Sequence, residues 1–188
     1  MTAQTFIVLL LGLVLLVYAG IALTAWLRMR GTRVIVCPET QKPAAVEVDA
    51  AHAAVSAMWE NADLRLKDCS RWPERKGCDQ GCVAQIAIAP HDTLATALLQ
   101  RFFEGKRCAI CRRAIAPVQG TQPKPGLFNV ASHEVIAWDE IPAQNLPDAL
   151  ATHLPVCANC QVAETFRRQF PDLVTDRNDK PDSSSLTH

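Results

Sequence analysis

The sequence predicts an α+β fold, with one N-terminal transmembrane helix followed by a small cysteine-rich region. Three observations predict it: an uncharged apolar segment at residues 6–27, short segments with strand-like or helix-like spacing after it, and eight cysteines beyond that segment. A chain of 188 residues holds one ordinary domain or two small ones, which excludes a large multidomain enzyme. Because 19 basic residues balance 19 acidic ones, binding to duplex DNA through bulk charge is not expected.

The apolar segment is long enough to cross a membrane as a single helix. At 1.5 Å per residue it would measure roughly 33 Å, against about 30 Å for the hydrocarbon core of a bilayer. A cleaved signal peptide is the competing interpretation, but no basic residue precedes the segment and the apolar run is too long for one. We therefore expect residues 6–27 to contact the lipid bilayer.

The charges beside this segment predict its orientation. Arg28, Arg30 and Arg33 follow it, and no basic side chain precedes it. The positive-inside rule places residues 1–5 outside the cytoplasm and the rest of the chain inside. The prediction is a single-pass protein of a bacterial inner membrane with a cytoplasmic C-terminal region. In that reducing compartment cysteines are expected to bind metal as thiolates rather than to form disulfides.

Residues 33–90 are expected to form a first cysteine-containing α+β subdomain. Alternating apolar residues predict strands at 33–36, 45–48 and 64–69. Asp49 is a suitable N-cap for the short alanine-rich helix that follows it. A further helix over residues 82–89 would end before Pro90.

Residues 91–171 are expected to form a second subdomain. Its first helix would be capped by Asp92 or Thr93 and would end at Gly105 in a left-handed C-cap. The inner face of that helix would consist of residues four apart: Leu94, Leu98 and Phe102. A hairpin at 127–130 and 135–138 and a short helix or irregular segment over 142–153 would follow.

A last amphipathic helix is predicted at residues 158–170. Its inner face would carry Val162, Phe166 and Phe170, and Pro171 would end it. Residues 176–188 are polar and have no periodicity, which predicts a disordered tail.

Two Cys-x-x-Cys motifs predict a metal site in the second subdomain. They are Cys108 with Cys111 and, after 45 intervening residues, Cys157 with Cys160. Two such turns supply the four thiolates that tetrahedral Zn²⁺ requires. Iron bound as in rubredoxin uses similar paired turns, and the ligands alone do not separate the two metals.

The order of elements around these motifs resembles the treble-clef or zinc-ribbon class over residues 105–170. In that class the first pair lies on a turn called a knuckle, a hairpin comes next, and the second pair begins a helix. The resemblance implies a structural zinc ion held by Cys108, Cys111, Cys157 and Cys160. It names no family of known activity.

The other four cysteines suggest a second site of the same kind, with a second zinc ion. Cys37 follows a predicted strand, Cys69 ends another, and Cys78 and Cys82 are one helical turn apart. Ordinary buried cysteines in a small core, or a site in which His52 replaces one thiol, are the alternatives.

Several other chemistries fit the motifs poorly. Attachment of c-type haem needs a histidine directly after a Cys-x-x-Cys motif, but Arg112 and Gln161 stand there. HNH nucleases also hold zinc with two such motifs, and His133 and Asn145 extend the resemblance, but Ser132 stands where those enzymes usually have an acidic residue. A thioredoxin-like redox motif would be a single Cys-x-x-Cys in a βαβ unit.

Basic residues gather beside both cysteine sets. Near the first set lie Arg65, Lys67, Arg71, Arg75 and Lys76, and near the second set lie Arg101, Lys106, Arg107, Arg112 and Arg113. They favour charge compensation of anionic metal centres over nucleic-acid contact.

The sequence therefore predicts a membrane-anchored zinc-binding protein without enzymatic activity. It would act as a structural or interaction module at the inner membrane face and would bind a protein partner there. An iron or thiol redox protein is the first alternative. A treble-clef nucleic-acid-binding or degenerate HNH-like protein is the second, although nucleic acid is not the expected partner.

Overall fold

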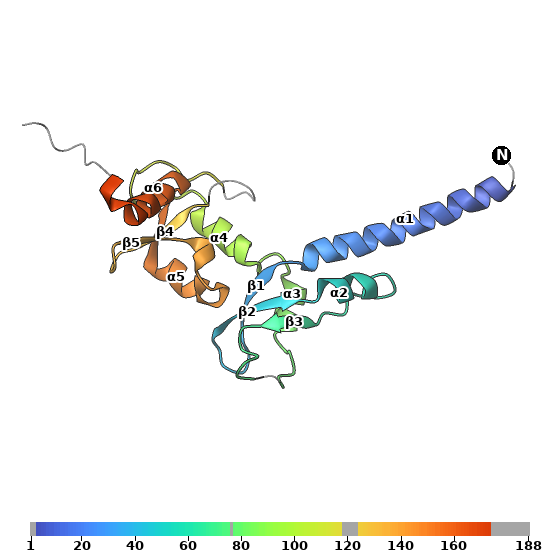
Figure 1. The fold of residues 1–188 in the computed structure, drawn as a ribbon. Coiled ribbons are helices and arrows are strands. Elements are labelled where there is room, and N and C mark those ends of the chain that lie inside the picture. Colours follow the sequence, from blue (N-terminus) through green and yellow to red (C-terminus); the bar gives the residue numbers. More distant parts are fainter. Residues whose placement is uncertain (1–2, 76, 118–123, 174–188) are drawn as a thin grey trace, which may run out of the picture. The chain divides into compact units, whose positions relative to one another are not determined.

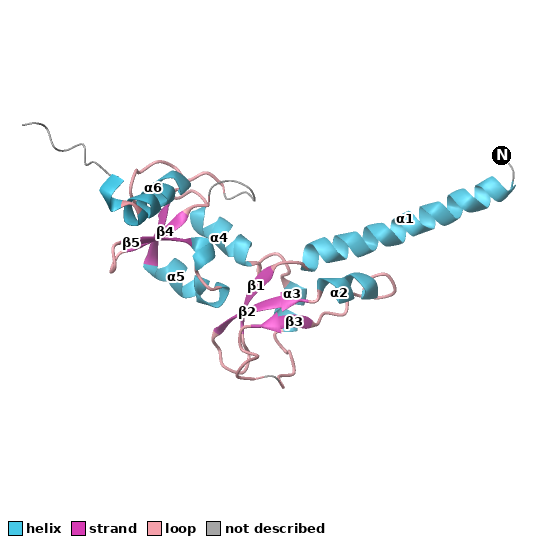
Figure 2. Cartoon of the chain, in the orientation of Figure 1, coloured by secondary structure: helices cyan, strands magenta, loops and turns pink. Residues whose placement is uncertain are grey.

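The computed structural model describes residues 3–75, 77–117 and 124–173 (Figures 1 and 2). It combines helices with two three-stranded antiparallel sheets, which confirms a mixed helix and sheet fold. Contacts divide the chain into two compact units. The first unit runs to Glu104 and also includes Ile141–Ala151, and the second comprises Gly105–Glu140 and the chain from Thr152. The predicted tail at residues 176–188 lies outside the described residues.

Helix α1 spans Ala3–Met29 in the first unit and is long and apolar enough to cross a membrane. Its 27 residues correspond to about 40 Å of helix. None of its most apolar window is buried by the rest of the protein. Helix α2 lies beside the C-terminal part of α1 (Figure 1), and the rings of Tyr18 and Trp59 are 6.1 Å apart.

The first sheet has the strand order β1-β2-β3. Its strands are β1 (Thr32–Val36), β2 (Pro43–Val48) and β3 (Leu66–Cys69). The helices of this unit after α1 are α2 (Ala50–Ser56), α3 (Val83–Ile88), α4 (Ala95–Phe103) and α5 (Leu146–Thr152). The strands and helices predicted for residues 33–90 are thus confirmed, including the Asp49 cap, whose carboxylate accepts a hydrogen bond from the His52 amide at 3.0 Å.

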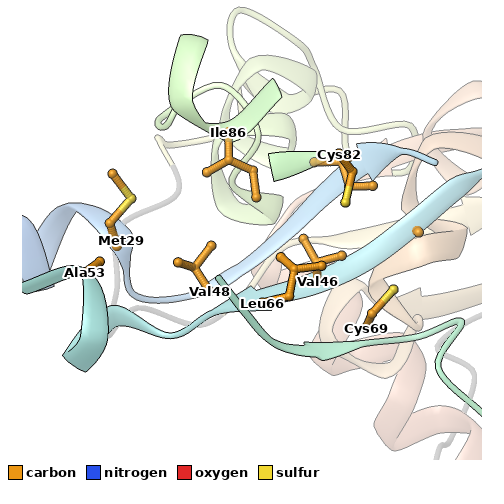
Figure 3. Close-up of a cluster of buried hydrophobic side chains, with 10 residues drawn as sticks. Met29, Val46, Val48, Ala53, Leu66, Cys69, Cys82 and Ile86 are labelled. Carbon is orange, nitrogen blue, oxygen red and sulfur yellow. The ribbon is translucent and has the colours of Figure 1, made fainter. Parts of the chain in front are cut away.

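A buried cluster joins this sheet to α1, α2 and α3. Figure 3 shows Met29 of α1, Ala53 of α2 and Ile86 of α3 around Val46 and Leu66 of the sheet. Burial of such apolar side chains stabilises the unit by roughly 1.5–3 kcal/mol for each large one. The cluster therefore attaches the end of the apolar helix directly to the first sheet.

Arg33 is fully buried in β1, although the sequence suggested only a flanking charge. Its guanidinium donates to the carbonyl oxygens of Arg28 and Pro90 and to the hydroxyl of Thr93. The Arg28 carbonyl belongs to the last turn of α1, where a cation also complements the helix dipole. Arg33 thus connects the end of α1 to the segment before α4.

The details predicted for α4 need correction. Its N-cap is Leu94 without a side-chain hydrogen bond, because the Asp92 carboxylate pairs with Arg101 and the Thr93 hydroxyl accepts from Arg33. The buried residues are Ala95, Leu99 and Phe103, one position later than expected. The predicted left-handed Gly105 is confirmed by its φ of 67°.

The second unit contains the other sheet, with strand order β5-β4-β6. Its elements are β4 (Gly126–Asn129), β5 (Glu134–Ala137), β6 (His153–Val156) and α6 (Ala158–Gln169). The predicted hairpin and last helix are therefore confirmed. The predicted inner face of α6 is wrong, since Val162, Phe166 and Phe170 are 54%, 47% and 47% exposed.

Candidate metal centre

Cys108 begins a tight turn stabilised by backbone hydrogen bonds. Its amide donates to the carbonyl of Arg113 at 2.9 Å, and the Arg112 amide donates back to the Cys108 carbonyl at 3.0 Å. Arg112 has a φ of 61°, which reverses the chain. The turn presents Cys108 and Cys111 on one side.

The second pair lies at the start of α6. Cys157 is the N-cap in an extended conformation, and Cys160 lies in the first helical turn. The Ala109 amide donates to the Pro155 carbonyl of β6 at 2.8 Å, which holds the turn beside this helix start. Gly126 permits a close approach of α6 to β4, because a Cβ there would lie 2.7 Å from Cγ of Gln161.

The four sulfur atoms form a compact group. Those of Cys108, Cys111, Cys157 and Cys160 all lie within 4.8 Å of one another, and the sulfurs of Cys111 and Cys157 are 3.7 Å apart. A tetrahedron with metal–sulfur bonds of about 2.3 Å has edges of roughly 3.8 Å. The thiols are therefore spaced to bind a metal ion such as zinc or iron.

The pKa values of these thiols are also consistent with binding of a cation. Burial raises the pKa of Cys108, but hydrogen bonds from the backbone amides of Cys157, Cys111 and Ile110 outweigh it and bring the pKa to about 6. Burial raises the pKa of Cys157, and burial together with hydrogen bonds to the other thiols raises the pKa of Cys160. One thiolate is thus stabilised by the backbone, whereas ionising all of them requires a positive ion at their centre.

The surroundings of the group are partly buried. Cys108 has no exposed surface and packs with Val135 and Val156, whereas Cys111 is exposed. Phe128, Ile115 and Ala109 contact the same cluster. The group of four cysteines thus has one side against the sheet and one side at the surface.

Comparisons with known proteins give no relative for this chain. No protein-family model matches it, and no curated protein or solved structure matches it. The geometry of the cysteines therefore carries the argument about function.

The other four cysteines lie together in the first unit. Cys37, Cys69, Cys78 and Cys82 all line one pocket beside the first sheet. Burial and the neighbouring Cys69, Cys78 and Cys37 raise the pKa of the Cys82 thiol to about 11. In the part of the chain that the structure describes, these sulfurs do not form a second group within 4.8 Å.

The histidines considered as ligands or catalytic residues, and Asn145, have other neighbours in the structure. The Nε2 of His52 forms a hydrogen bond with the Asp63 carboxylate at 2.8 Å, and His52 does not line the cysteine pocket. His133, in a turn with a φ of 58°, lies near the Phe128 ring, and His153 pairs through Nδ1 with the Thr152 hydroxyl. Asn145 belongs to the first unit and His133 to the second.

Many of the basic residues form ion pairs. Arg65 pairs with Asp63, Arg71 with Glu74, and Arg75 with Glu39 at 2.8–3.0 Å, and Arg101 pairs with Asp92. Lys76 lies outside the described residues. These pairings agree with local charge balance better than with a surface that neutralises phosphates.

Proposed function

We propose that this chain is a membrane-anchored zinc protein that acts as a non-enzymatic structural and interaction module at the cytoplasmic face of the inner membrane. The observation that carries the proposal is the grouping of the sulfurs of Cys108, Cys111, Cys157 and Cys160 within 4.8 Å of one another. The order of turn, hairpin and helix supports assigning the second unit to the treble-clef or zinc-ribbon class. Zinc bound there would contribute folding energy directly.

Two observations support the membrane anchor. Helix α1 has the length and hydropathy of a membrane span, and the rest of the protein buries none of the residues in its most apolar window. Arg28 and Arg30 are exposed at its C-terminal end, which supports a cytoplasmic location for the two units beyond the helix. Arg33 does not contribute to this signal as an exposed charge, because it is buried.

The exposed face of α6 supports a protein partner. Val162, Phe166 and Phe170 form an apolar stripe, and the rings of Phe166 and Phe170 are 5.0 Å apart. Arg167 and Arg168 stand at the end of the same helix. Such a helix fits an apolar groove bordered by acidic residues.

Metal analysis of the full chain, purified from membranes in detergent, tests the proposal. We expect zinc in the wild type and its loss from this site in a Cys108→Ser/Cys157→Ser variant, while Ser132→Ala, in the exposed hairpin turn, keeps wild-type zinc content. The chain should stay with the membrane during alkaline carbonate washing. A chain that carries no metal, or that washing releases, would contradict the proposal.

Iron is the second candidate, because Cys111 is exposed and would give an electron carrier access to the centre. Visible absorption of the anaerobically purified protein separates the two metals. Zinc thiolates are colourless in the visible range, whereas an iron–thiolate centre is coloured.

A further inference from the structure

The turn after β1 has the same backbone hydrogen bonds as the turn that carries Cys108. The Cys37 amide donates to the Lys42 carbonyl at 2.9 Å, as Cys108 does to Arg113 at 2.9 Å. The Gln41 amide donates to the Cys37 carbonyl at 2.8 Å, as Arg112 does to Cys108 at 3.0 Å. The fifth residue of each turn has a positive φ, 55° at Gln41 and 61° at Arg112. Residues 37–42 therefore form a second knuckle.

The two knuckles also place similar backbone donors around the sulfur of their first cysteine. Backbone amides two and three residues later, those of Glu39 and Thr40, bond to the sulfur of Cys37, as those of Ile110 and Cys111 do to Cys108. Amides directed at a sulfur stabilise a thiolate, which is the form that binds metal. Thr40 stands where Cys111 supplies the second ligand, so the remaining ligands must come from elsewhere.

Three other cysteines meet this knuckle. Cys69 at the end of β3 is 8% exposed, Cys82 before α3 is 6% exposed, and Cys78 is half-buried. In Figure 3 the side chains of Cys69 and Cys82 extend toward one another from opposite sides of the core. All three line the same pocket as Cys37. Four thiols from segments far apart in the sequence thus line one pocket, although their sulfurs are not yet within 4.8 Å of one another.

The other groups at this pocket carry both charges and one unused donor. Four thiolates and one Zn²⁺ carry a formal charge of −2; Arg71 and Arg75 line the pocket, and so do Asp79 and Glu39, which pairs with Arg75. The Nε1 of Trp72, which also lines it, is buried and has no hydrogen-bond partner among the described residues. Indole N–H and guanidinium groups are donors that charged sulfur can accept from.

We propose that Cys37, Cys69, Cys78 and Cys82 bind a second zinc ion in the first unit. This site is independent of the metal centre in the second unit, and the proposed function does not depend on it. Binding would draw the segment that bears Cys78 and the knuckle together until the sulfurs reach tetrahedral spacing. It would also place a metal in the unit that is joined to α1.

The test is zinc stoichiometry in the full chain purified in detergent, with each cysteine set as the matched control for the other. We expect two zinc ions per wild-type chain, one in Cys37→Ser/Cys82→Ser, and one in Cys108→Ser/Cys157→Ser. One zinc in the wild type that Cys37→Ser/Cys82→Ser retains would overturn this inference. One zinc that this variant loses, but that Cys108→Ser/Cys157→Ser retains, would instead overturn the proposed function.

A second test uses only the wild type, so its result does not depend on whether a variant folds. Thiol alkylation of the zinc-loaded chain, read at each cysteine by mass spectrometry, should be slow at Cys37 and Cys78 and at least tenfold faster after a chelator removes the metal. Equal rates at both residues with and without the chelator would overturn the inference.

Discussion

The two units share one kind of cysteine turn but support it differently. In the second unit the buried cluster at the metal centre comprises Cys108, Val135 and Val156, and α6 has no buried residue. In the first unit the turn borders a larger cluster that includes Ile35, Val46, Leu66 and Ile86. The comparison teaches that similar thiol turns can contribute unequally to folding. We expect the second unit to depend on its metal and the first to keep most of its sheet without one.

Loss of the metal centre gives the largest expected effect. Cys108→Ser should unfold the second unit, because structural zinc contributes on the order of 10 kcal/mol to such small units. Limited proteolysis with mass spectrometry should show new cleavage after Gly105 but continued protection of β1–β3. The Ser132→Ala variant serves as the control. If both units stayed protected from proteolysis in Cys108→Ser, the two units would not differ in their dependence on metal.

Replacing Arg33 by Met should destabilise the first unit alone, by about 2–4 kcal/mol, because the carbonyl groups of Arg28 and Pro90 lose a charged donor. Thermal unfolding followed by circular dichroism would measure the change. Arg101→Met removes an exposed ion pair instead and should cost under about 1 kcal/mol. Equal effects of the two variants would show that the buried connection adds no stability.

The close packing of α6 on β4 allows a test within the second unit. Gly126→Ala would place a methyl group 2.7 Å from Gln161 and 3.0 Å from Val135, so a cost of about 1–3 kcal/mol is expected. Zinc affinity should fall as well, since the start of α6 carries Cys157 and Cys160. Gly20→Ala in α1, which meets no atom within 4 Å, is the matched control. Unchanged zinc affinity in Gly126→Ala would show that the packing of α6 on β4 does not influence metal binding.

Asp63 gives the smallest expected effect and a dependence on pH. The hydrogen bond from His52, with a contribution from Arg65, lowers the pKa of this exposed carboxyl. A lowered folded pKa means that the stabilisation is present above the unfolded value, near pH 3.9, and is lost as the pH falls through the folded value. The melting temperatures of wild type and Asp63→Asn should therefore differ slightly above pH 5 and converge in stronger acid. A difference that persists in acid would assign the effect to something other than this charge.

The sequence pattern predicted the elements better than it predicted their surroundings. Alternation and four-residue spacing identified most of the strands and helices but missed β6, and the Asp49 cap and Gly105 were predictable from local chemistry. The pairs Cys108–Cys111 and Cys157–Cys160 were recognisable because each motif is local. Periodicity identifies an apolar face but not whether anything covers it, which is why Val162, Phe166 and Phe170 were placed inside.

Contacts between residues that are distant along the chain could not be predicted from the sequence either. Nothing local distinguishes Arg33 from Arg28 and Arg30, yet its guanidinium is buried by residues near position 90 that only the folded chain brings together. The knuckle at Cys37 was equally hidden, since Thr40 replaces the second cysteine of the motif. Its signal is the backbone, where Gln41 adopts a positive φ.

The buried guanidinium of Arg33 bears on how an anchored protein would be positioned. It joins the last turn of α1 to the first unit only three residues beyond Arg30, so no flexible tether separates the two. In the membrane-anchored protein that we propose, the first unit would therefore keep a fixed orientation relative to the helix that crosses the bilayer. A partner bound to that unit would then be held at a set angle to the membrane.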